Sequence, residues 1–110
     1  LDWEMATIGD PLCDLAWGLT TDDVSSHGLN IEKLPGSIAN EEAIKFWEKN
    51  TSFSADNFFY YRILCLFKFS VIMIRVAKKL IHNEIMPLDS DFHVNNHVSN
   101  YLRQEFNEKN

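Results

Sequence analysis

The most constraining feature of this chain is a strongly apolar run over residues 58–77, long enough to raise the question of a membrane-spanning helix. Three cations interrupt the run, at Arg62, Lys68 and Arg75, and each would cost about 3 kcal/mol at a bilayer centre. The longest uncharged stretch, residues 69–74, is far shorter than the roughly 20 residues that a span requires. The run therefore predicts a long helix from about residue 56 to about residue 83, at the centre of a helical core and covered on most sides.

Three shorter helices are predicted around the long one. Asp10 is a good N-cap and Pro11 suits a first helical turn, and a helix of about ten residues follows on the apolar spacing of Leu12, Leu15, Ala16 and Leu19. Residues 20–39 are polar and contain Gly28, Pro35 and Gly36, so we expect a long loop there. Further helices are expected over residues 40–50 and 91–106. The apolar stripe of the last helix would consist of Val94, Val98, Tyr101, Leu102 and Phe106.

The predicted helices indicate a mainly α fold, and the length of 110 residues fits one small domain over residues 1–110, or part of a larger one. Apolar residues make up 45% of the chain and aromatic residues 13%, which excludes a disordered chain. The net charge is −6 and the cations gather only near Arg75, Lys78 and Lys79, which argues against nucleic acid as a partner. Cys13 and Cys65 lie in apolar helical patterns, so we expect buried, reduced thiols in a cytoplasmic protein.

The amino-terminal residues carry the clearest chemical signal. Residues 1–4 have the pattern of a strand end, with Asp2 in an apolar frame. A carboxylate there is a suitable ligand for a hard cation such as Mg²⁺, which takes its other ligands from elsewhere. The alternative is a structural Asp that caps the following turn. Because the sequence starts within this element, we expect the groups that work with Asp2 to precede it in a longer protein.

The same segment resembles a known family. The residues that carry the resemblance are Leu1-Asp2-Trp3-Glu4, Gly9-Asp10-Pro11 and Asp14-Leu15-Ala16-Trp17. They resemble the segment that follows the catalytic loop in the aminoglycoside phosphotransferase and choline kinase-like family, whose members have a protein-kinase-like (α+β) fold. The branch associated with acyl-CoA dehydrogenases is the most similar, and Tyr60-Tyr61 and the stretch at residues 67–72 resemble it less specifically. The first seventeen residues are the specific part.

The resemblance implies a role for several acidic residues. Asp2 would be the magnesium-binding Asp, whose cation bridges the phosphates of ATP. Glu4 would support that site without touching the ion, Trp3 would pack, and Asp10 would cap the helix. Asp14 would be buried and would accept backbone N–H bonds from the catalytic loop, because a buried carboxylate needs donors. The alternative for Asp14 is an exposed residue in the first helical turn, where the helix dipole favours it.

The resemblance also implies that the helices wall the site of the phosphoryl acceptor. The candidate wall residues are Trp17, Trp47, Tyr60 and Tyr61, although aromatic side chains in such patterns are more often part of a core. His93 and His97 lie four residues apart and could share a metal, but two ligands make a poor zinc site, so a solvated helix face is preferred.

The chain lacks most of what the family uses for catalysis. A His-Gly-Asp-type loop, a second metal-ligating Asn, the small-lobe Lys and a glycine-rich phosphate loop do not occur in it. We therefore expect the C-terminal part of an ATP- and Mg²⁺-dependent phosphotransferase acting on a small-molecule hydroxyl, with a hydroxyacyl thioester as one candidate. This part alone should be inactive, and exposed apolar surface should favour self-association. The alternative is a non-catalytic helical interaction or dimerisation module derived from the kinase lobe.

Overall fold

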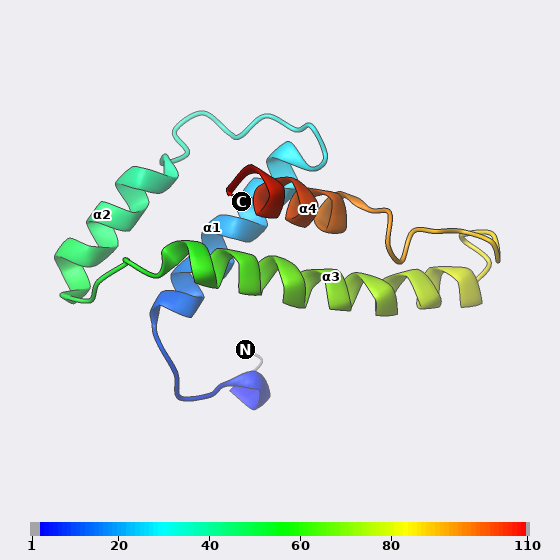
Figure 1. Cartoon of the computed structure of the whole chain (residues 1–110), viewed down its shortest axis with the longest axis horizontal. Coiled ribbons are helices and arrows are strands. Elements are labelled where there is room, and N and C mark those ends of the chain that lie inside the picture. The colour runs from blue at the N-terminus through cyan, green and yellow to red at the C-terminus, as the bar shows by residue number, and fades with distance from the viewer. Residues whose placement is uncertain (1–2, 110) are drawn as a thin grey trace.

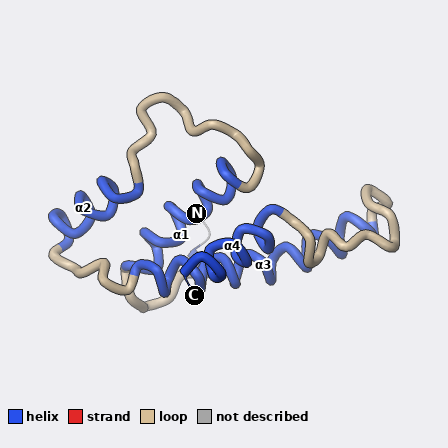
Figure 2. The backbone as a smooth tube through the Cα atoms, turned by 45° about the horizontal axis from the view of Figure 1, so that its top comes forward, coloured by secondary structure: helices blue, strands red, loops and turns tan. Residues whose placement is uncertain are grey.

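Five helical segments form the regular structure of the chain, which a computed structural model describes from residue 3 to residue 109 (Figure 1). A 3₁₀ helix, Trp3–Met5, comes first. It is followed by α1 (Leu12–His27), α2 (Asn40–Thr51), α3 (Phe58–His82) and α4 (His97–Lys109). Within residues 3–109 there is no β-strand (Figure 2), so the mainly α class is confirmed. No helix in this range combines the length and the apolar character needed to cross a bilayer.

The long helix α3 is the spine of the fold, and α1 and α4 pack against it (Figures 1 and 2). Its observed bounds agree closely with the prediction from the apolar run. The core forms where these three helices meet, around Val24 of α1, Leu66 and Met73 of α3, and Val98 and Tyr101 of α4. Burial of apolar area at this junction is the main term that holds the helices together.

Helix α3 is covered along one side, so the expectation of coverage on most sides is wrong. Leu66 and Met73 are buried, whereas Phe67 and Val71 on the opposite side are exposed. The physical reason is that only α1 and α4 pack on the spine, and α2 lies apart from it (Figure 1). Helix α2 matches the predicted range and contains no buried residue.

Helix α1 is longer than predicted, because residues 20–27 continue it instead of starting a loop. Thr20, Asp23, Val24 and Ser26 are all buried. Two hydroxyls find acceptors within the helix, since Thr21 donates to the Trp17 carbonyl and Ser25 to the Thr21 carbonyl, each at 2.8 Å. Tertiary burial therefore overrides a composition that favours a loop.

Helix α4 begins later than predicted, at His97. Residues 91–96 form turns, and the buried Asn96 caps the helix by accepting the Ser99 N–H on its side-chain oxygen at 3.0 Å. Of the predicted apolar stripe, Val98 and Tyr101 are buried, while Val94 precedes the helix and Phe106 is exposed. The cap, which the apolar spacing did not reveal, fixes where the helix starts.

The strand predicted over residues 1–4 is wrong for the residues that the structure describes. Trp3 and Glu4 lie in the 3₁₀ helix, and Leu1 and Asp2 lie outside the described residues. A strand requires a neighbour to pair its backbone groups, and residues 3–109 contain no strand to serve as one. The turn instead pairs its own backbone, with the Ala6 N–H donating to the Trp3 carbonyl at 3.0 Å.

Candidate functional site

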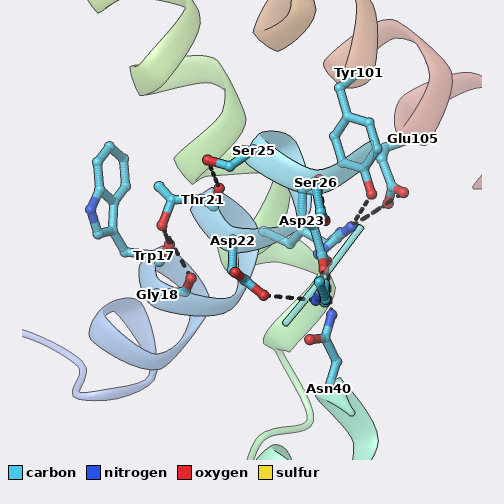
Figure 3. Close-up of polar contacts among 12 residues, drawn as sticks. Trp17, Gly18, Thr21, Asp22, Asp23, Ser25, Ser26, Asn40, Tyr101 and Glu105 are labelled. Carbon is cyan, nitrogen blue, oxygen red and sulfur yellow. Dashed lines mark hydrogen bonds and ion pairs between the residues drawn. The ribbon is translucent and has the colours of Figure 1, made fainter. Parts of the chain in front are cut away.

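A buried cluster of charges joins the three packed helices. Arg62 of α3 donates from Nη1 to Asp23 Oδ2 of α1 at 2.6 Å and from Nε to Glu105 Oε2 of α4 at 3.0 Å. Its Nη2 donates to the Tyr101 hydroxyl at 2.7 Å (Figure 3). Asp23 is 3% exposed and Arg62 is 8% exposed, so the pair is withdrawn from water. A guanidinium suits this position because its planar fork can serve two carboxylates at once.

The loop after α1 and the start of α2 complete the cluster. Lys33 Nζ lies 2.9 Å from Asp23 Oδ1 and 2.8 Å from Asp22 Oδ2, and Asn40 Nδ2 donates to Asp23 Oδ2 at 2.7 Å. Burial alone would raise the pKa of Asp23, but hydrogen bonds from Lys33, Arg62 and Asn40 outweigh it and hold that pKa below its ordinary value. Asp23 is therefore the anionic centre of the cluster.

Arg62 of α3 and Tyr101 of α4 respond to the same charges. Burial disfavours the charged form of Arg62, but its hydrogen bonds to Glu105 and Asp23 favour that form, and the net effect raises its pKa. Burial raises the pKa of Tyr101 to about 12, although the nearby Arg62 cation opposes the shift. The Arg62 guanidinium lies 5.6 Å from the centre of the Tyr101 ring, within range of a cation–π contact.

A polar hollow of about 700 Å³ lies beside this cluster. Besides the cluster residues, its lining includes His27, Gly28, His97, Asn100 and Gln104. The Oδ1 atom of Asn40 is buried and has no hydrogen-bond partner among the described residues. Both carboxylates are already paired with Arg62, which makes the cluster a structural clamp rather than a source of a catalytic acid, base or nucleophile.

The structure places three of the four predicted acidic residues, Glu4, Asp10 and Asp14, at the amino-terminal end of the fold. Asp2 lies outside the described residues, while Trp3 and Glu4 are exposed, so the expected packing of Trp3 is not seen. Asp10 caps the first turn of α1, since its Oδ1 accepts the Leu12 N–H at 2.9 Å. The expected capping role is thus confirmed, with the helix starting after Pro11.

Asp10 also links the amino-terminal segment to α3. Its Oδ2 accepts a hydrogen bond from the Tyr61 hydroxyl at 3.0 Å, and this bond raises the pKa of Tyr61. Asp14 is exposed in the first turn of α1. The expected burial of Asp14 is therefore not observed, and the alternative, an exposed residue in the first helical turn, is. An acidic residue there interacts favourably with the positive end of the helix dipole.

The four candidate wall residues make three separate ring contacts. Tyr60 and Tyr61 pack edge to face with centroids 5.2 Å apart. Trp17 packs against Phe69 at 5.9 Å, and Trp47 stacks on Phe53 at 6.1 Å. Of the four, Tyr60 lines a hollow between α3 and α4. Trp17 thus packs α1 against α3, and Trp47 packs α2 against the segment that follows it.

Both cysteines have free thiols, Cys65 buried and Cys13 half-buried. Burial raises the pKa of Cys65 to about 11, with a further contribution from the neighbouring Cys13. No group of three potential metal ligands occurs among residues 3–109. His97 begins α4 whereas His93 lies in the preceding turns, so they do not share one helix face.

Sequence reasoning missed the buried charge cluster, although a signal for it exists. Asp23 follows Ala16 by seven residues and Thr20 by three, so all three share one helix face if the helix continues beyond residue 19. Arg62 precedes the buried Leu66 by four residues. With the first helix extended past residue 19, an acidic and a basic residue on the apolar faces of two helices would have indicated buried charges, although not that they pair with each other.

Comparisons with protein-family models, with curated proteins and with solved structures return no match to this chain.

Proposed function

We propose that this chain is the C-terminal helical part of the large lobe of an ATP- and Mg²⁺-dependent cytoplasmic phosphotransferase with a protein-kinase-like fold. The observation that carries the proposal is the double role of Asp10, in the Gly9-Asp10-Pro11 stretch of the resemblance. Its two oxygens bond to the Leu12 N–H of α1 and to the Tyr61 hydroxyl of α3. The segment that resembles the family is thereby fixed to both helices, as a segment that positions a ligand requires.

The proposed chemistry places one magnesium ligand on this chain. The carboxylate of Asp2 is the hard oxygen donor that Mg²⁺ prefers, and a bound Mg²⁺ would neutralise charge on the phosphates of ATP. Residues 3–109 offer no group of three ligands of their own, so the remaining ligands and the ATP contacts would come from elsewhere in the lobe.

The acceptor would be a small molecule with a hydroxyl group, such as a hydroxyacyl thioester. Among the candidate wall residues, Tyr60 lies on a hollow whose lining is almost entirely apolar. An apolar wall suits an acyl chain better than a sugar or a polyamine. Tyr61, held by Asp10, would lie nearer the metal end of such a site.

The test uses this chain and the complete gene product that contains it. The chain alone should show no Mg²⁺-dependent ATP turnover, and the coding sequence upstream should encode a His-Gly-Asp-type loop about twenty residues before Leu1, as the resemblance implies. In the complete product, Asp2→Asn should reduce phosphoryl transfer on the order of 10³-fold, while the matched Asp89→Asn, at an exposed position, should change it little. Turnover by the chain alone that Asp2→Ala abolishes, or full activity in Asp2→Asn, would contradict the proposal.

The second candidate is a non-catalytic helical interaction module, which the exposed apolar side of α3 favours. A start codon immediately before Leu1 would support this candidate over the kinase. Exposed apolar residues outside α3, such as Leu34, Phe46 and Leu88, should also cause self-association of the chain. Light scattering that finds a monomer over a wide concentration range would contradict that expectation.

A further inference from the structure

An apolar stripe with coiled-coil spacing runs along the exposed side of α3. It consists of Tyr60, Leu64, Phe67, Val71 and Ile74, separated by four, three, four and three residues. Tyr60 is 63% exposed and Phe67 is 58% exposed, although both are large apolar or aromatic side chains. A 4–3 repeat of apolar residues is the pattern by which one helix packs against another.

The stripe forms one wall of a groove between α3 and α4. Two hollows, of about 450 Å³ and about 240 Å³, lie along this boundary and share Phe67, Leu102 and Arg103 in their linings. We call this continuous depression the α3/α4 groove. It extends along α3 from Tyr60 to Ile74, which at 1.5 Å per residue is roughly 20 Å, or about four turns of a docked helix.

The rims of the α3/α4 groove are positively charged in a chain whose net charge is −6. Helix α3 contains no Asp or Glu, and no acidic residue lines either hollow. Lys68 and Arg75 follow Leu64 and Val71 by four residues each, so helix spacing places them beside the stripe, one turn further along α3. Lys78 follows Ile74 by four residues, and it lies beyond the end of the groove and lines another hollow. None of these three cations forms an ion pair with a described residue.

The α4 rim adds a fourth cation. Arg103 lines both hollows, and its guanidinium donates to the Asn100 side-chain oxygen at 2.8 Å and to the Val94 carbonyl at 2.9 Å. Both partners are neutral, so the positive charge of Arg103 is not compensated by them. An apolar floor with cations on both sides is therefore complementary to an apolar stripe flanked by carboxylates.

We propose that the α3/α4 groove binds an amphipathic α-helix of a partner protein, whose apolar stripe is flanked by Asp and Glu. This proposal goes beyond the phosphotransferase function, because it requires neither ATP nor Mg²⁺. A second copy is disfavoured, since pairing two α3 stripes would place Lys68 and Arg75 near like charges. A flat anionic membrane is disfavoured because the apolar surface is a concave groove, which matches the helix-in-groove mode of recognition.

The test uses two synthetic peptides of about 18 residues, which as helices are about one turn longer than the groove. Both carry Leu in a 4–3 repeat, flanked by Glu in one peptide and by Lys in the other. Fluorescence anisotropy at low ionic strength should show that the chain binds the Glu peptide about tenfold more tightly than the Lys peptide. High salt should reduce this preference, because the rim charges are exposed.

Charge-reversal variants locate the binding site. Lys68→Glu with Arg75→Glu should invert the peptide preference, whereas the matched pair Lys45→Glu with Lys49→Glu, which changes the charge equally on exposed positions of α2, should leave it unchanged. Phe67→Ala should weaken binding of both peptides about equally. Because the substituted side chains are exposed, circular dichroism should show unchanged helix content.

Three results would overturn the proposal. The first is equal binding of the two peptides, or a preference for the Glu peptide that persists in the variant with Lys68→Glu and Arg75→Glu. The second is a dimer of the unmodified chain that the same reversal dissociates, which would make a second copy the occupant. The third is tighter binding to anionic phosphatidylserine vesicles than to the Glu peptide, with loss of both on reversal. ATP and Mg²⁺ have no part in these measurements, so their outcome is independent of the phosphoryl-transfer step. A helix docked at Tyr60 would, however, occupy the hollow that the phosphotransferase proposal gives to the acyl chain of the acceptor.

Discussion

Two adjacent aspartates allow the same substitution to be compared in two environments. Asp22 and Asp23 both contact Lys33, at 2.8 Å and 2.9 Å. The Asp22 side chain is 58% exposed, whereas that of Asp23 is 5% exposed. Replacement of either one by Asn removes one negative charge and preserves the size of the side chain. The comparison therefore contrasts an exposed ion pair with a buried carboxylate that has several partners.

The expected losses of stability differ several-fold. Asp23 accepts hydrogen bonds from Lys33, Asn40 and Arg62, so an Asn there would place its own N–H₂ group against donors. Breaking one partner of a buried pair leaves Arg62 with a single carboxylate and costs about 3–5 kcal/mol. Asp22→Asn removes one exposed ion pair and should cost no more than about 1 kcal/mol.

Urea denaturation monitored by circular dichroism at neutral pH measures both values. The two variants should keep the m-value of the unmodified chain, because the exposed surface on unfolding is the same, and should differ in their midpoints. Equal losses for Asp22→Asn and Asp23→Asn, or a loss below about 1 kcal/mol for Asp23→Asn, would show that the cluster does not hold the helices as argued.

Three further outcomes follow from the same structure. Because the pKa of Asp23 is lowered on folding, its contribution is present above the unfolded pKa of about 4 and is lost as the pH falls through the folded value. A plot of unfolding free energy against pH should thus fall less steeply below about pH 4 in Asp23→Asn than in the unmodified chain. Leu66→Ala, at a fully buried position, should cost about 2–5 kcal/mol in the same denaturation assay, and a loss below about 1 kcal/mol would contradict its place in the core. Burial raises the pKa of Cys65 to about 11, so iodoacetamide at about pH 8 should leave Cys65 unlabelled by mass spectrometry until urea unfolds the chain; rapid labelling of folded Cys65 would count against its burial.

The helices that were predicted well are those in which a local signal agrees with the packing. The apolar run of α3 is so long that its helical nature does not depend on its neighbours, and its bounds agree closely with the prediction. Asp10 and Pro11 mark the start of α1 because a cap bond forms between residues two positions apart. Helix α2, which packs least on the spine, was also predicted correctly from its own residues.

The errors lie where distant residues decide the local structure. Residues 20–27 are polar, and they are helical because Asp23 and Val24 are buried by α3 and α4. The start of α4 depends on Asn96. Its cap bond joins residues three positions apart, but its burial depends on parts of the chain that are distant in sequence. For the site, Asp10 was identified from its position, but the partnership of Asp23 with Arg62 spans 39 residues and could not be read from spacing alone.

By itself the sequence determined that the chain is mainly helical, that α3 is its longest element and that Asp10 starts α1. These properties depend on apolar periodicity and caps, which act over one or two turns. Only the tertiary structure decided which polar residues are buried and which side of α3 stays open. A carboxylate such as Asp23 is tolerated inside because Arg62 and Lys33 reach it from other segments, and the α3/α4 groove exists because α4 covers only part of the spine.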